Sequence, residues 1–312
     1  MAGFGIFSLL SALVGSQLHL AALRLLTGLG LGGGIPLAIA LASDVSPPLM
    51  QGRLVTLISA GVPIGVAAGG FLASQLERGF GWPAIFVVGG ILPLALSLPL
   101  VLWLPESLAP TAVTHRKNPV TALFREGLAS STVLLWAMNL LNLLSNYFIL
   151  LWMPAILHGT GVASSWAIFV TTLYGVGVIV GALLTAPIVD RVGVEPVLTW
   201  VLALGALCVL SIGLLNPPFW TLAVMICGAG VGIGGCQAGI NSLSGSIYPQ
   251  AIRSTGAGWA LGAGRVGTIA GPLLGGMLLA LGWRTQTIFI VLSVPAFSVA
   301  LLMATLGRLR RS

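Results

Sequence analysis

The chain has 312 residues, of which 57% are hydrophobic and 6% are charged, and its formal net charge is +7. Soluble domains carry about 25% charged residues, so this composition excludes a protein whose surface faces water. Lipid cannot hydrogen-bond the backbone, which leaves helices or a closed barrel, and the long apolar runs lack the alternation of barrel strands. We therefore expect an all-α membrane protein.

Ten apolar segments are long enough to cross a bilayer, which takes about 20 helical residues. In chain order they are residues 2–17, 20–43, 54–77, 83–104, 131–157, 165–189, 196–215, 219–247, 255–281 and 285–306. The longest polar stretch, 105–130, is expected to be a cytoplasmic loop between two bundles. The expected domains are therefore a four-helix N-terminal remnant at 1–104 and a six-helix bundle at 131–312.

Basic residues gather on one side of the membrane if the first connection, residues 17–19, faces outside. The inside then holds Arg53, Arg116, Lys117, Arg125, Arg191, Arg253, Arg308, Arg310 and Arg311, and the outside holds Arg78 and Arg284. This bias is typical of cytoplasmic loops and places the C-terminus in the cytoplasm. It also explains the net charge without nucleic acid as a partner.

The chain contains a repeat with an offset of 200 to 203 residues. Gly28, Gly30, Gly32 and Gly34 recur as Gly228, Gly230, Gly232 and Gly234; Arg53 recurs as Arg253; and Gly81-Trp82 recurs as Gly282-Trp283. Parallel repeats of this kind build two-bundle transporters. Because the second copy has six expected spans and the first has four, the pattern predicts a twelve-helix protein that lacks its first two helices. A genuine ten-helix protein is the alternative.

Several motifs resemble those of the major facilitator superfamily. RLLTGLG at 24–30 resembles the signature of its fourth helix, DRVG at 190–193 the tail of its loop motif, and LPES at 104–107 the end of its sixth helix. GVPIG at 61–65, FVVGGILPL at 86–94, YFILLWMP at 147–154 and GRVGTIAGPLLGG at 264–276 together resemble the aromatic acid:proton symporter family.

The resemblance implies a two-bundle fold with ten of its twelve helices present. It implies a carrier in the bacterial inner membrane that takes up benzoate-like or hydroxybenzoate-like carboxylates with protons, by alternating access. The proton gradient would supply the energy, no cofactor is expected, and the partners would be substrate, protons and lipid. We expect a monomer. Another carrier of the superfamily, for sugars or other organic anions, and an inactive truncated copy are the alternatives.

Two arginines lie within expected spans, where an isolated charge costs at least about 2–3 kcal/mol. Arg24 either snorkels outward or faces a cavity on the proton or substrate route, which the resemblance favours. Arg265 lies near the midplane, where it could hold a carboxylate by two parallel hydrogen bonds. Alternatively, Arg265 is a buried charge bonded to backbone carbonyls or to an acid on the missing helices.

Polar side chains at helical spacing are candidates for the remaining substrate contacts. Three amides recur at i, i+3 and i+7 on one expected helix and two at i and i+4 on another, so each set shares one face. The candidates are Asn139, Asn142, Asn146, Tyr147, Tyr174, Gln237 and Asn241. Trp152 could also stack on an aromatic ring. Hydrogen bonds between helices are the alternative role for the amides.

A third set of residues is expected to serve gating and helix packing. Gating by charged pairs at helix ends, or a place on the proton route, is expected for Arg24, Asp44, Arg53, Asp190, Arg191 and Arg253; the role of Asp44 rests on the resemblance. Close helix packing or local loosening is expected at Gly28, Gly30, Gly32, Gly271 and Pro272.

Catalysis and metal binding are not expected. The three histidines, His19, His115 and His158, lie in or near loops without a nucleophile–base cluster, and the three cysteines form no CxxC pair. All six acidic residues fall at or beyond the ends of the expected helices, so the residues themselves identify no proton carrier.

Overall fold

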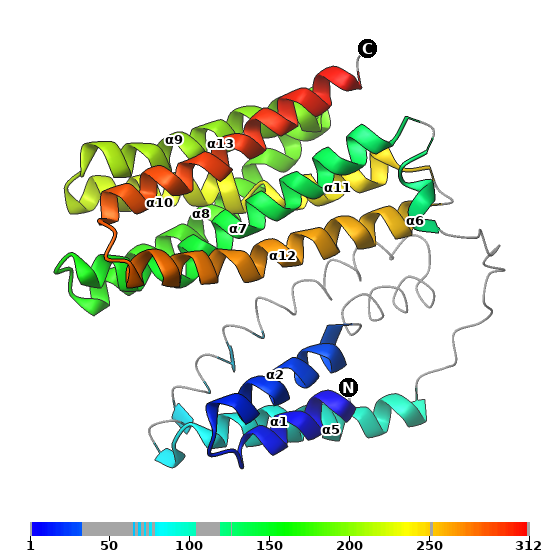
Figure 1. Ribbon diagram of the computed structural model, residues 1–312, viewed down its shortest axis with the longest axis vertical. Coiled ribbons are helices and arrows are strands. Elements are labelled where there is room, and N and C mark those ends of the chain that lie inside the picture. The colour runs from blue at the N-terminus through cyan, green and yellow to red at the C-terminus, as the bar shows by residue number, and fades with distance from the viewer. Residues whose placement is uncertain are drawn as a thin grey trace. The chain divides into compact units, whose positions relative to one another are not determined.

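The computed structural model describes residues 2–32, 65, 68–69, 72, 75–76, 79–103, 119–125, 127–249 and 252–310. The chain divides into two compact units, Met1–Thr114 and His115–Ser312, each of which is helical where it is described (Figure 1). Asp44 and Arg53, two of the expected gating residues, lie outside the described residues.

The first unit contains α1 (Ala2–Ser11), α2 (Gln17–Gly32) and α5 (Pro83–Trp103), with α1 packed against the other two. Glycines permit these contacts. A Cβ at Gly5 would lie 2.8 Å from Gly90 O of α5, and a Cβ at Gly30 would lie 2.9 Å from Phe4 N of α1. A Cβ at Gly28 would meet nothing within 4 Å. Of the two α2 glycines whose surroundings are described, Gly28 and Gly30, only Gly30 therefore makes the expected close contact.

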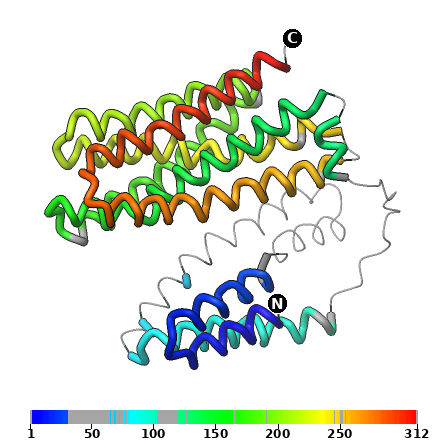
Figure 2. The backbone as a smooth tube through the Cα atoms, viewed as in Figure 1, coloured from blue at the N-terminus to red at the C-terminus, as the bar shows by residue number. Residues whose placement is uncertain are grey.

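The second unit contains α6 (Pro119–Ala122), α7 (Ala129–Gly159), α8 (Ser164–Val192), α9 (Val194–Leu215), α10 (Phe219–Ala229), the π-helix η1 (Gly230–Gly234), α11 (Gln237–Ile247), α12 (Arg253–Ala280) and α13 (Thr285–Leu309). Helix α7 packs most extensively against α12, whose backbone runs alongside it in Figure 2, and α9 packs most extensively against α13. These pairings set the positions of the candidate site residues.

Seven helices in the described residues are long and apolar enough to cross a membrane. They overlap the expected spans at 83–104, 131–157, 165–189, 196–215, 219–247, 255–281 and 285–306. The expected first span, residues 2–17, is longer than the observed helix, because α1 ends at Ser11. The expected loop at 105–130 also differs at its end: Leu123 is fully buried, and its carbonyl accepts a 2.8 Å hydrogen bond from Thr132 Oγ1.

Glycines of the second repeat seat η1 between two neighbouring helices. A Cβ at Gly230 would collide with the carbonyl oxygen of Tyr174 on α8. A Cβ at Gly205 of α9 would lie 2.7 Å from Gly232 Cα. The absence of side chains therefore lets this segment approach both α8 and α9 at backbone distance.

Candidate functional site

The predicted amide stripes on α7 and α11 meet in one hydrogen-bond network. Gln237 Nε2 donates to Asn139 Oδ1 at 3.0 Å and to Asn241 Oδ1 at 2.9 Å. Gln237 Oε1 accepts a 2.7 Å bond from Asn142 Nδ2. Asn139 and Asn142 are buried, Gln237 is half-buried and Asn241 is exposed. The network therefore runs from the interior of the second unit to its surface.

The amide network is attached to the π-helix. Asn142 Nδ2 also donates to Ile233 O at 3.1 Å, and Ile233 belongs to η1. The widened turn is visible in the 3.0 Å bond from Gly235 N to Gly230 O, five residues back. Single π-turns inside α-helices occur frequently at functional sites, so the bond to η1 favours a functional role for the amide network.

A second polar pair lies elsewhere on α7. Tyr174 OH of α8 donates to Asn146 Oδ1 at 3.2 Å, and Tyr174 is 1% exposed. Tyr147 is half-buried, and its side chain forms no hydrogen bond with the described part of the chain. The interhelical bonds of this network and of the Tyr174–Asn146 pair match the structural alternative for these residues, including Gln237. Asn241 is exposed, and its side chain bonds only to Gln237 of its own helix.

Arg265 projects from the exposed side of α12. It is the eleventh of the 26 residues in the span Thr255–Ala280, close to the midpoint. The opposite side of the helix faces α7: a Cβ at Gly267 would collide with Leu140 O, and one at Gly271 would lie 2.5 Å from Leu144 O. The Arg265 side chain makes no hydrogen bond or ion pair with any described residue, so these residues supply neither carbonyl nor acid as its partner.

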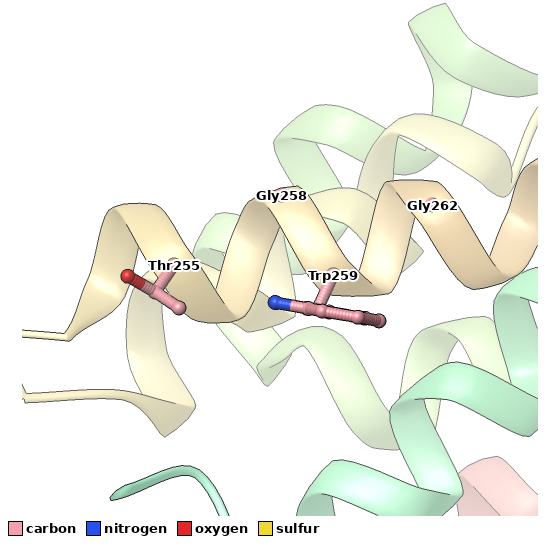
Figure 3. Close-up of a pocket in the computed structure, with 4 residues that line it drawn as sticks. All are labelled: Thr255, Gly258, Trp259 and Gly262. Atoms are coloured by element: carbon pink, nitrogen blue, oxygen red, sulfur yellow. The ribbon is translucent and has the colours of Figure 1, made fainter. Parts of the chain in front are cut away.

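A pocket of about 400 Å³ lies on the same helix and is lined by Thr255, Gly258, Trp259 and Gly262 (Figure 3). A Cβ at Gly258 or Gly262 would meet nothing within 4 Å, so no helix in the described residues uses these glycines for packing. Arg265 follows Gly262 by three residues and Gly258 by seven, which places all three on one helix face. The bare face therefore leads from the pocket to the guanidinium.

Trp259, which lines this pocket, belongs to a cluster of aromatic rings. Trp259 stacks on Trp136 of α7, with ring centroids 5.5 Å apart and an interplanar angle of 17°. Trp136 also meets the edge of Phe124 at 5.6 Å. The Trp136 indole nitrogen is buried without a hydrogen-bond partner in the described residues. Trp136 and Trp259 were not among the residues predicted from the sequence, although Gly258 and Gly262, one residue before and three residues after Trp259, were a sign of an open helix face.

Arg24 is held inside the first unit. Its Nη2 donates to Ser11 Oγ at 2.8 Å, and its Cζ lies 4.6 Å from the centre of the Phe86 ring. Ser11 Oγ in turn donates to Phe7 O at 2.7 Å. The Arg24 Nε is buried without a hydrogen bond to a described residue. The guanidinium is thus engaged by α1 and α5.

The side chains of the two expected gating acids, Asp44 and Asp190, lie outside the described residues, so the expected charged pairs stay a prediction. Arg191 is exposed in the last turn of α8, and Arg253 donates from Nε to Tyr248 O at 3.4 Å. The Asp190 backbone belongs to α8, but its side chain lies outside the described part.

An ion pair among the described residues was not predicted. Arg310 pairs with Glu195, and Arg310 Nη1 also donates to Ser246 Oγ at 3.3 Å, which connects α13, α9 and α11. The sequence did show a single acid, Glu195, at the start of one helix and a cluster of arginines at the end of another. No local pattern, however, links two residues that are 115 positions apart.

Pro272 is part of the contact between α12 and α7. Trp152 Nε1 donates to Pro272 O at 2.9 Å, and a Cβ at Gly275 would collide with the Trp152 ring. Trp152, expected as a stacking partner for substrate, therefore has a structural contact in this arrangement.

A family model described as the Major Facilitator Superfamily matches residues 1–163 and, in a second match, residues 135–312. The gallate transporter of Pseudomonas putida is 34% identical over 99% of this chain and 76% of its own length. The 4-hydroxybenzoate transporter PcaK of the same organism is 31% identical over 94% of this chain and 73% of its own length. The 3-(3-hydroxy-phenyl)propionate transporter of Escherichia coli K12 is 34% identical over 99% of this chain and 76% of its own length.

A solved structure shows the same fold. The inward-facing, unoccupied bacterial homologue of the human lysosomal transporter Spinster matches with a TM-score of 0.61 and 18% identity, over 97% of this chain and 77% of that one. The two family matches together cover the whole sequence, and the relatives are carriers rather than enzymes. The chain is a multi-pass membrane transport protein and belongs to the major facilitator superfamily.

Proposed function

We propose that the protein takes up aromatic carboxylates together with protons, by alternating access, across a bacterial inner membrane with its C-terminus in the cytoplasm. The observation that carries this proposal is Arg265: a guanidinium near the midpoint of a span, exposed, unpaired within the described residues and adjoining a bare, aromatic-bordered face of α12. The names of the relatives, which include gallate, 4-hydroxybenzoate and benzoate carriers, support an aromatic acid as the substrate.

Arg265 would bind the carboxylate. A guanidinium presents parallel N–H groups that match the two oxygens of a carboxylate, and charge-assisted bonds of this kind are about twice as strong as neutral ones. Removal of water from the site strengthens the attraction further. A neutral sugar would not compensate this charge, so an anionic substrate is favoured over the sugar-carrier alternative.

The amide side chains of Gln237 and Asn241 would contact polar substituents of the substrate's aromatic ring. Asn241 Nδ2 is a free donor within the described residues, and Asn241 Oδ1 and Gln237 Oε1 can each accept a further bond, so together they offer the donor and acceptors that a hydroxyl group requires. The aromatic ring itself would lie between this network and α12, near Tyr147. The substrate contacts would be supported by hydrogen bonds that fix the positions of α7, α8 and η1, made by Asn139, Asn142, Asn146 and Tyr174.

The conformational switch would use charges at helix ends. We assign Asp44, Arg53, Asp190, Arg191 and Arg253 to pairs that form in one state and break in the other, since such pairs make a packed interface bistable. Arg24, with its unpaired Nε, belongs to the proton or substrate route. The proton gradient is the energy source in this proposal, and the transporting unit is a monomer.

Uptake of radiolabelled 4-hydroxybenzoate into cells that express the chain tests the proposal. We expect accumulation that a protonophore abolishes, and we expect Arg265→Ala to abolish it at unchanged protein level. Arg284→Ala, which removes an exposed arginine at the start of α13, is the matched control and should transport normally.

Three outcomes distinguish the alternatives. Full uptake by Arg265→Ala would remove the anion role of that residue. Accumulation that persists with the protonophore would remove proton coupling. Failure of the parent chain to accumulate any aromatic acid, with a different anion or a sugar transported instead, would support another carrier of the superfamily, and failure with every solute would support an inactive copy.

A further inference from the structure

A groove on the outer surface of the second unit lies between α9 and α13, which run side by side in Figure 1. Its volume is about 540 Å³, and its walls include Thr199 of α9 and Ser293, Val294, Leu301 and Ala304 of α13. Val294 is 61% exposed and Leu301 is 67% exposed. The groove is therefore open on the exposed side of two helices that are long and apolar enough to cross the bilayer.

The hydroxyl groups in the groove are already satisfied. Thr199 Oγ1 donates to Glu195 O at 2.7 Å, and Ser293 Oγ donates to Ile290 O at 2.6 Å. Ser298 Oγ donates to Val294 O at 2.9 Å. Because each proton goes to a carbonyl of the same helix, the wall offers no free donor, and an apolar occupant leaves no polar group unpaired.

The length of the groove matches one leaflet. Ser293 and Ala304 are separated by roughly 16 Å along α13 at a rise of 1.5 Å per residue. The hydrocarbon core of a bilayer is about 30 Å thick, so half of it is close to this length. Ser293 and Ala304 lie four residues before and seven residues after Phe297, the midpoint of α13, so a single acyl chain that enters at the Ala304 end would fill the groove and end just beyond the midplane.

A free cation lies at one end of the groove. Arg308 follows Ala304 by four residues and Leu301 by seven, so it continues the face of α13 that lines the groove. Arg308 is exposed, and its side chain makes no hydrogen bond or ion pair with a described residue. Its neighbour Arg310 is already engaged by Glu195 and Ser246. Arg308 is thus available to an anion at the membrane–water interface.

We propose that this groove binds one anionic phospholipid, with an acyl chain between α9 and α13 and the phosphate on Arg308. Guanidinium groups bind phosphate through parallel charge-assisted bonds, and basic sites between membrane helices on the cytoplasmic side hold anionic head groups. A zwitterionic lipid with the same tails fits the groove but brings its own cation, so it binds more weakly. The site does not depend on the transported substrate.

Native mass spectrometry of the purified full chain, delipidated and titrated with phosphatidylglycerol or phosphatidylcholine of identical chains, tests the proposal. We expect one phosphatidylglycerol to be retained in preference to phosphatidylcholine. Arg308→Gln should weaken its retention about fivefold, the effect of one basic residue near an anionic lipid, whereas Arg308→Lys should retain it. Ala304→Phe, which fills the groove, should abolish retention.

Two variants serve as matched controls, and four outcomes would overturn the proposal. Arg284→Gln removes an arginine at the other end of α13, and Val291→Phe enlarges an exposed side chain outside the groove; both should bind like the parent. The proposal fails if Arg308→Gln retains the lipid like the parent, or if phosphatidylcholine binds equally well. It also fails if glycerol phosphate displaces the lipid at equal concentration, which would indicate a head-group site alone. A dimer that forms through α13 and excludes lipid would equally refute it.

Discussion

Gln237 is the centre of the amide network, and its replacement by methionine should destabilise the second unit. The substitution keeps the length of the side chain but removes its donors and its acceptor. Asn139 Oδ1 then loses the bond from Gln237 Nε2, while Asn142 Nδ2 keeps its second bond, to Ile233 O. One buried polar atom without a partner costs about 1–3 kcal/mol, and an average interhelical bond in a membrane contributes about 0.6 kcal/mol. We expect a loss of about 1–3 kcal/mol.

Reversible unfolding in mixed micelles, followed by circular dichroism, measures this loss. Gln286→Met is the matched control, because Gln286 is half-buried on α13 and its side chain forms no hydrogen bond with the described part of the chain; its effect should stay within about 0.5 kcal/mol. A double-mutant cycle with Asn142→Leu should show coupling between the two positions. If Gln237→Met unfolds at the same denaturant concentration as the parent, the network is not a stabilising element and the reasoning is wrong.

Two further perturbations follow from the packing. Gly267→Ala should cost about 1–3 kcal/mol in the same unfolding assay because its Cβ would collide with Leu140 O, whereas Gly262→Ala, which meets open space, should cost nothing; equal costs would refute the packing role. Glu195→Gln should cost less than about 1 kcal/mol, and high salt should reduce the difference from the parent, because the pair with Arg310 is partly exposed and screened. A larger, salt-independent loss would show that this pair acts as a buried one.

The amino-acid sequence by itself determined the membrane-spanning segments and the residue types of the site. Hydropathy and helix length follow from the thickness of the bilayer and from the need to satisfy the backbone within each segment, so the second unit's spans agree with the expected ranges. The i, i+3 and i, i+4 spacings of the amides on α7 and α11 are likewise local properties of a helix.

The tertiary structure alone decided which of these faces meet. Gln237 bonds to residues 95 and 98 positions away, Arg310 pairs with an acid 115 positions away, and Trp136 stacks on a ring of α12. Lipid is as apolar as a leucine side chain, so hydrophobicity does not distinguish a helix face that packs on protein from one that faces lipid. Close backbone approach at glycines and the pairing of polar groups make that distinction, and both depend on the register between helices that are distant in the sequence.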